Sequence, residues 1–220
     1  MRRTSLIAAG VVVLAVVLLG VAQLVLPGIA ASSIRDRLSR SGKVLDVQVS
    51  AFPAIELLWH QADHVVVRMA SYHSTASALS QNVGQVADVG SLDASAAELS
   101  SGLLTLRDAG LHKRGNQLTA TGTVTEADLR SSLPVLDSVQ PVASANGALT
   151  LQGTATILGV TATVDATVRP QDGALIVAPD VPFGGLATIT LFSNPAIAVE
   201  GVSAAPAPGG FTFAAQALVR

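Results

Sequence analysis

Apolar and polar residues alternate with a period of two over the longest patterned part of the chain, residues 149–168. Leu, Gly, Ala, Ile and Val occupy every second position there, and Thr, Gln and Asp fill most of the positions between them. A period of two with one apolar side is typical of a β-strand that has one buried and one solvated face. Leu158-Gly159 interrupts the run near its middle, so the segment predicts a β-hairpin.

Shorter stretches of the same kind predict further strands. The alternation in residues 45–51 predicts one strand, with Leu45 as the first of its apolar positions. Arg114-Gly115-Asn116 is a turn signal that predicts a second hairpin. The remaining predicted strands are residues 103–113, 117–124, 174–179, 186–192 and 210–219. Between the last two, the Gly-, Ala- and Pro-rich segment GVSAAPAPGG, residues 201–210, predicts an exposed loop.

Two short helices are predicted between these strands. Pro53 suits the first turn of a helix, and a run of valines that starts at Val65 demands extended structure again. The region therefore predicts a strand, a short helix and a strand. Thr125 and Asp128 form the [ST]-x-x-[DE] capping pattern of a second helix, which Pro134 ends.

The beginning of the chain is uniformly apolar instead of alternating. Residues 6–26 contain no charged residue and follow Arg2 and Arg3. At 1.5 Å per residue, a helix of this length spans roughly 30 Å, which is the thickness of a hydrocarbon core. An uncleaved signal anchor is therefore favoured, although Gly28-Ile29-Ala30 is also a small-x-small site at which a signal peptide could be cleaved.

The predicted organisation is a signal anchor over residues 1–27, a helical neck over residues 28–42 and a β-rich domain over residues 43–220. One apolar segment near the amino terminus normally exports the chain that follows it. We therefore expect a single-pass protein of the cell membrane whose C-terminal domain lies outside the cytoplasm. The protein is expected to be secreted if the segment is cleaved.

Composition removes several classes of function. The 220 residues include 13 Lys and Arg against 15 Asp and Glu, and a net charge of −2 excludes the concentrated basic surface that nucleic acids require. The chain has no cysteine, so disulfides, thiolate metal sites and cysteine nucleophiles are excluded. Hydrophobic residues make up 50% of the chain but aromatic residues only 3%, so Ala, Val and Leu must build the core.

Candidate metal ligands are few. His60 and His64 are four residues apart, but a metal pair at that spacing needs one continuous helical face, and the predicted helix ends before His64. His73 and His112 are isolated in the sequence and are predicted to lie on the surface. We therefore predict no metal and no cofactor.

Sequence motifs of common enzymes are missing as well. The chain has no Gly-x-Ser-x-Gly, no His-Glu-x-x-His and no Ser-x-x-Lys. The prediction is a protein that is not an enzyme. A carboxylate pair assembled by the fold remains an alternative, with Asp63, Asp108 and Asp128 as the first candidates.

The apolar faces of the predicted strands combine Val and Leu with repeated Ala and Gly. A closed core interlocks large and small side chains at high density, whereas faces of this kind leave space. They predict an open apolar trough or, alternatively, small residues that pack against a close helix. The positions predicted to line a trough are Leu118, Ala120, Leu149, Leu151, Ala155, Ile157, Val160, Ala162 and Val164.

Three segments carry a family resemblance. They are VQVSAFPAIELLWHQADHVVVRM, LTATGTVTEADLRSSL and LTLQGTATILGVTATVDATVRPQDGALIVAP. In this order they resemble the strands and helices of the actinobacterial lipomannan-elongation-factor family of envelope phospholipid-binding proteins. The resemblance covers most of residues 30–180, and the chain departs from the family pattern in residues 71–90 and in its tail.

The resemblance implies an α+β fold similar to tubular lipid-binding domains, in which a strongly curved antiparallel β-sheet wraps around a helix and shelters acyl chains. The residues that match the Phe-Pro step and the two helices of the family are Phe52, Pro53, Leu57, Leu58, Asp128 and Leu129. Phe52, Leu57 and Leu58 therefore join the predicted lipid-binding residues. No catalytic residue is implied.

The predicted function is phospholipid binding in an apolar groove by a membrane-anchored protein of the cell envelope, serving lipid or lipoglycan metabolism. The expected partners are a phospholipid and the membrane, and proteins of envelope biosynthesis are further candidates. The alternative is a non-catalytic structural or protein-binding β domain tethered to the membrane. Four basic residues of the neck would contact anionic headgroups or form an ordinary solvated surface: Arg35, Arg37, Arg40 and Lys43.

Overall fold

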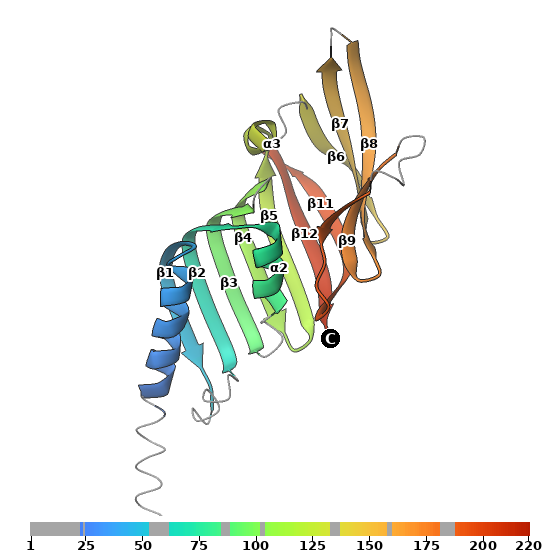
Figure 1. Ribbon diagram of the computed structural model, residues 1–220. Helices are drawn as coiled ribbons and strands as arrows, with labels where there is room; N and C mark the ends of the chain where they lie inside the picture. The colour runs from blue at the N-terminus through green and yellow to red at the C-terminus, as the bar shows by residue number, and fades with distance from the viewer. Residues whose placement is uncertain are drawn as a thin grey trace, which may run out of the picture.

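Two open β-sheets make up most of the protein (Figure 1). The structure, a computed structural model, describes residues 23, 25–52, 62–84, 89–101, 104–132, 137–157, 160–180 and 188–220. The β-rich fold predicted from the alternating pattern is confirmed. The helix predicted to begin at Pro53 lies outside the described residues.

The larger sheet has seven strands in the order β1-β2-β3-β4-β5-β12-β11. These strands are β1 (Gly42–Ser50), β2 (Ala62–Ser74), β3 (Val89–Ser101), β4 (Leu104–Arg114), β5 (Gln117–Thr125), β11 (Ile197–Ala207) and β12 (Gly210–Val219). The smaller sheet has the order β10-β9-β8-β7-β6. Its strands are β6 (Ser138–Ala145), β7 (Ala148–Ile157), β8 (Val160–Gln171), β9 (Ala174–Pro179) and β10 (Ile189–Phe192).

Three helices accompany the sheets. The first, residues 25–38, runs beside β1 at the edge of the larger sheet, and we call it the neck helix (Figure 1). α2 (Ala76–Gly84) connects β2 to β3, which are parallel and therefore need such a crossover. Thr75 caps α2, because its Oγ1 accepts a hydrogen bond from the Ala78 N–H at 3.2 Å. α3 (Glu126–Ser132) follows β5.

None of the helices within the described ranges is long and apolar enough to cross a bilayer.

One face of the larger sheet is apolar and carries the main core. A single row across five strands, aligned by the strand register, consists of Val65, Leu92, Lys113, Leu118 and Ala217, all of them buried. Leu79 and Val83, four residues apart on α2, pack against the same cluster, so the helix covers this face of the sheet (Figure 1). The opposite face is largely polar, because the period of two directs the intervening Thr, Ser, His and Asp residues there.

Lys113 is the one charged residue in this buried row. Its ammonium group donates a hydrogen bond to the Val89 carbonyl at the start of β3. The aliphatic stem therefore packs among apolar neighbours while the charged head reaches toward the end of the sheet.

The smaller sheet is attached to the outer edge of β11. Its β6–β7 and β8–β9 hairpins end in the turns Asn146-Gly147 and Asp172-Gly173, whose residues all have positive φ, as type I′ turns require. The Gly147 carbonyl accepts a hydrogen bond from the Val202 N–H at 2.9 Å, and the Gly173 carbonyl accepts one from the Val199 N–H at 2.9 Å. Two turns therefore occupy an edge that would otherwise leave backbone groups unpaired.

A β-bulge in β11 allows the side chains of both Val199 and Val202 to face the core while their N–H groups bond the two turns. The register with β12 shifts between Val199 and Gly201. As a result, Ile197 and Val199 face the core before the bulge, and Val202 faces it after the bulge. The inward positions change from odd to even numbers along the strand.

The structure corrects several sequence-based expectations. There are two sheets instead of one, and the β2–β3 pair is parallel. Residues 201–207 of the segment predicted as an exposed loop form the second half of β11. The strand accommodates Pro206 because it lies at the edge of the sheet, and its bulge hides the alternation from sequence reasoning. Leu45 points outward, since a register shift between Val44 and Asp46 brings Val44 to the core face in its place. α2, β3 and β6 were not predicted.

Gly147→Ala is expected to destabilise the protein more than Gly115→Ala. Both glycines have positive φ, so both substitutions introduce backbone strain of about 1 kcal/mol. A Cβ at residue 147 would also lie 3.2 Å from the Glu200 carbonyl oxygen, whereas nothing lies within 4 Å of a Cβ at residue 115. Denaturant unfolding should show a loss of about 2 kcal/mol or more for Gly147→Ala. Equal losses for the two variants would contradict the importance of the turn contact.

Candidate functional site

The apolar sides of the two sheets face each other. Val124 of β5 and Phe211 of β12 form a buried pair against which residues of the smaller sheet pack. Around this pair lie five partly buried side chains, which we call the apolar seam: Leu106, Val139, Leu151, Ala204 and Phe213. The seam joins β4, β11 and β12 of the larger sheet to β6 and β7 of the smaller one. It is apolar throughout, yet its members retain contact with solvent.

Exposure rises along the β7–β8 hairpin away from β11. Leu149 and Val168 pair at the base of the hairpin and are only 3% and 4% exposed. Val164 is on the same face of β8, four residues from Val168 and nearer the tip, and it is 39% exposed. Ala162, the next inward position along β8, is also exposed. The inward face of the hairpin is therefore closed at its base and open toward its tip.

Phe213 is the aromatic residue of the seam. A Cβ built on Gly122, its partner across β5 and β12, would lie only 2.9 Å from the ring atom Cε1 and 3.1 Å from Cζ. The ring therefore lies directly over the Gly122 backbone, in space that a larger residue would fill. Leu106 also approaches this position, at 3.6 Å. Because residue 122 has no side chain, the Phe213 ring packs directly against the backbone of β5.

The predicted lining residues fall into different environments. Leu118 and Leu149 are buried in closed clusters, Leu151 belongs to the seam, and Ala120 is half-buried on the inward face of β5. Ala162 and Val164 lie on the open part of the hairpin. Ala155, Ile157 and Val160 hold the expected places in β7 and β8, but their side chains are outside the described part.

Phe52, from the family resemblance, is 81% exposed after the end of β1, away from the seam. Leu57 and Leu58 lie outside the described residues. No measured contact tests whether any of the predicted residues touches a lipid, so this assignment stays a prediction.

Sequence reasoning missed Leu106, Val139 and Phe213. The signal for Phe213 was present, because every second residue of GFTFAAQALV from Phe211 onward is apolar and faces the core. Leu106 is hidden by a bulge at Asp108, which has a φ of 48° and interrupts the alternation of β4. Val139 lies in β6, where Pro141 and small residues obscure the pattern.

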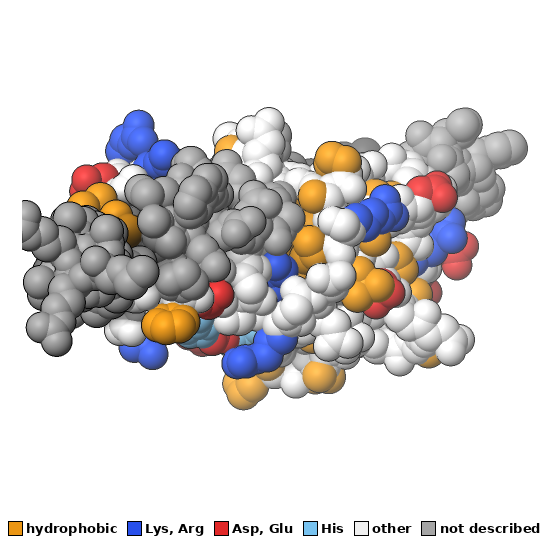
Figure 2. All heavy atoms as spheres, turned by 90° about the horizontal axis from the view of Figure 1, so that it is seen from below, with side chains coloured by type: hydrophobic (Ala, Val, Ile, Leu, Met, Phe, Trp, Pro, Cys, Tyr) orange, Lys and Arg blue, Asp and Glu red, His pale blue; other side chains and the backbone are white. Residues whose placement is uncertain are grey.

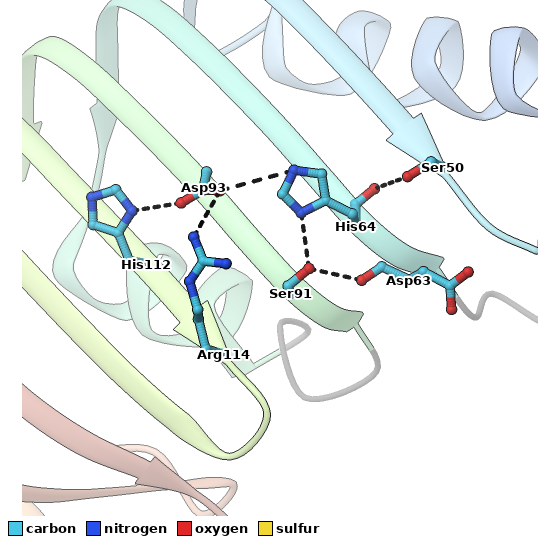
Figure 3. Close-up of polar contacts among 7 residues, drawn as sticks. All are labelled: Ser50, Asp63, His64, Ser91, Asp93, His112 and Arg114. Atoms are coloured by element: carbon cyan, nitrogen blue, oxygen red, sulfur yellow. Dashed lines mark hydrogen bonds and ion pairs between the residues drawn. The ribbon is translucent and has the colours of Figure 1, made fainter.

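A polar cluster occupies the opposite, solvated face of the larger sheet (Figure 3). Asp93 is at its centre: its Oδ1 lies 2.7 Å from His112 Nδ1, and its Oδ2 lies 3.8 Å from an Arg114 nitrogen and 3.9 Å from His64 Nε2. The hydrogen bond to His112 is the main cause that lowers the pKa of Asp93, and the positive charge of Arg114 adds to it. The cluster thus links β2, β3 and β4, and His112 lies on the surface as predicted, with its side chain 52% exposed.

The same cluster places a serine beside a histidine and a backbone carbonyl. Ser91 Oγ lies 2.8 Å from His64 Nδ1 and donates its own proton to the Asp63 carbonyl at 2.9 Å. The geometry is that of a cross-strand hydrogen-bond network on a solvated face.

The three carboxylates considered as an acid–base pair have structural roles in the described structure. Asp63 accepts a hydrogen bond from the Phe52 N–H at 2.6 Å. Asp128 accepts hydrogen bonds from Arg107 at 3.0 and 3.2 Å and from Thr125 at 2.6 Å, and these bonds lower the pKa of Asp128. Its own N–H bonds Thr125 Oγ1 at 3.1 Å, which confirms the predicted cap of α3. Asp108 forms the bulge of β4.

Metal ligation finds no support among the described residues, where no group of three or more His, Asp or Glu residues is placed to hold a metal ion. His60 lies outside this part of the chain, and His64 is in β2, as the sequence predicted.

Asp128→Asn is expected to lower the free energy of unfolding by about 1 kcal/mol at pH 7, because the cap of α3 and the Arg107 ion pair weaken together. Because the folded pKa of Asp128 lies below its unfolded value, its contribution is present above that unfolded value and is lost as the pH falls through the folded pKa. Denaturant unfolding between pH 7 and 3 should therefore show the gap between wild type and variant shrinking in acid. Asp36→Asn, on the exposed side of the neck helix, is the control; an Asp128→Asn gap that stayed constant with pH would contradict the ionic role.

A model of the LmeA-like phospholipid-binding family matches residues 17–198. The match spans well over half of the chain and includes the neck helix and β1 through β10, but not β12 with Phe213 or most of β11. Comparison with curated proteins and with solved structures gave no match. The family resemblance carried by the three sequence segments is confirmed. The chain belongs to the LmeA-like phospholipid-binding family.

Proposed function

We propose that this protein is a membrane-anchored, extracytoplasmic member of its family that shelters phospholipid acyl chains against the apolar seam and the open face of the β7–β8 hairpin. The observation that carries the proposal is the partial exposure of apolar side chains on the facing sides of the two sheets, at Phe213 and Leu151 in the seam and at Val164 on the hairpin. Membership of a phospholipid-binding family supplies the class of ligand. A role in cell-envelope lipid or lipoglycan metabolism is part of the proposal.

Burial of hydrocarbon supplies enough free energy for such binding. Each methylene transferred from water to an apolar site contributes about 0.8 kcal/mol, so ten methylenes contribute roughly 8 kcal/mol. That amount offsets much of the cost of withdrawing an acyl chain from a bilayer, where a comparable free energy holds it. No reactive group is required, which agrees with the structural roles of the polar clusters.

The proposed anchor brings the domain to its ligand. Residues 6–26 are long enough to span a hydrocarbon core, and tethering at the bilayer raises the local concentration of lipid around the domain. The basic residues of the neck are a weaker candidate for headgroup contacts. Arg35 and Arg37 lie in the last turns of the neck helix, at least 15 Å from residue 25 at about 1.5 Å per residue.

A structural or protein-binding role is the second candidate. It is favoured by the closed packing of Leu118 and Leu149 and by the exposed edge strand β6, where Val142 is 47% exposed. In that case the interior would take up no lipid, and β6 would pair with a partner.

Val164→Asp is expected to reduce the amount of phospholipid that copurifies with the full chain by roughly tenfold or more, because a carboxylate on the open apolar face opposes burial of hydrocarbon beside it. Thr163→Asp is the matched control: residue 163 is also exposed, on the same strand, but faces the other side of the sheet. Native mass spectrometry after release from detergent measures lipid occupancy. Unchanged occupancy in Val164→Asp, or equal loss in both variants, would contradict the proposed site.

A further inference from the structure

One end of the larger sheet is defined by the strand register. Ser50, His64, Ser91 and Arg114 lie side by side across β1 to β4, each opposite the next. The register continues to Gln117 at the start of β5. We call this end the anchor-side edge. The figures show it as the lower end of the sheet in Figure 1 and the face turned to the viewer in Figure 2.

The neck helix begins near this edge and ends at the opposite one. Its C-terminal turn is fixed at the far end of the sheet, where the Ser41 carbonyl accepts a hydrogen bond from the His73 N–H at 2.7 Å and Gly42 pairs with Tyr72. The helix and β1 run in opposite directions (Figure 1). Residues 25–38 span about 20 Å of helix, and β1 returns over a comparable distance of about 26 Å. The chain that precedes residue 25 therefore leaves the domain at the anchor-side edge.

Exposed apolar side chains gather at the same edge. Phe52 follows directly after β1 and is 81% exposed, and its backbone is held by the hydrogen bond from its N–H to Asp63. Val25 and Ile29, in the first turns of the neck helix, are also exposed. Viewed from this end, hydrophobic side chains lie beside histidine and acidic ones (Figure 2).

The charged residues of the neck helix lie toward its C-terminal end, away from the anchor-side edge. The first turns, with Val25 and Ile29, are apolar, and the arginines begin at Arg35. At the anchor-side edge itself, Arg114 and His112 face Asp93, so the charges of the polar cluster largely offset one another. An edge with exposed apolar groups and little net charge suits the interface of a bilayer without demanding anionic lipid.

We propose that the anchor-side edge rests on the phospholipid bilayer, with the Phe52 ring inserted into the interfacial region. The inference rests on the proposed function, because it needs residues 6–26 to lie in the membrane. Aromatic side chains are enriched at this depth, and interfacial apolar groups sit about 5–10 Å into the boundary between headgroups and acyl chains. The larger sheet then stands upright on the membrane, and the β7–β8 hairpin points away from it (Figure 1).

The test uses single labels on the full chain, which has no cysteine of its own. Asn116→Cys, in the β4–β5 turn, places an environment-sensitive fluorophore at the anchor-side edge, and Leu104→Cys places one at the other end of β4. The labelled proteins are reconstituted into phosphatidylcholine vesicles with and without a headgroup-linked quencher, and a parallel set contains phosphatidylglycerol. We expect the label at residue 116 to be quenched several-fold more strongly than the label at residue 104, with both lipids.

Phe52→Asp in the Asn116→Cys background should reduce the quenching several-fold. Leu45→Asp is the matched control, because Leu45 is also an exposed apolar residue of β1, 56% exposed, but lies toward the far end of the strand. Equal quenching of the two labels, or equal effects of the two aspartates, in protein that floats with the vesicles would overturn the docking while leaving the proposed function intact. Protein that does not float with vesicles would overturn both the anchor and the docking.

Discussion

The contact between two glycine turns and the edge of β11 is the constraint on which the rest of the structure depends. The Gly147 and Gly173 carbonyls accept hydrogen bonds from the outward N–H groups of Val202 and Val199. Both turns need left-handed backbone, and a Cβ at residue 147 would lie tightly against β11, 3.2 Å from the Glu200 carbonyl oxygen. These bonds close an exposed strand edge and set the smaller sheet across the larger one, so that the two apolar faces confront each other.

The attachment of the smaller sheet to β11 explains why burial decreases along the β7–β8 hairpin. Near β11 the hairpin base packs tightly, with Leu149, Val168 and Val202 in one buried cluster. Farther from this attachment, side chains such as Phe213 and Val164 remain partly in solvent. Family membership identifies phospholipid as the ligand class, and the polar face of the larger sheet carries a cross-strand hydrogen-bond network.

Strands with uninterrupted alternation could be predicted from the sequence, and strands with bulges could not. The β7–β8 and β4–β5 hairpins and the cap of α3 follow from local patterns and are found at the predicted positions. The sequence of residues 201–210 predicts a loop because the bulge of β11 moves the inward positions from odd to even, and bulges have the same effect on Leu45 and Leu106. β3 is rich in serine and alanine, whose low strand propensity is overridden by packing against the core. The predicted lining residues Leu118, Ala120, Leu149 and Leu151 lie on inward faces of the two sheets, whereas the seam depends on contacts between strands distant in the sequence and could not be predicted from local patterns.

Photocrosslinking with a phospholipid that carries a diazirine near the end of one acyl chain tests the central claim most directly. The full chain is loaded with this lipid and irradiated, and the modified peptides are identified by mass spectrometry. We expect adducts on inward positions of β5, β7, β8 and β12, with Leu151, Val164 and Phe213 among them. Adducts confined to the polar face of the larger sheet, or to the exposed edge strand β6, would contradict an acyl chain held between the two sheets.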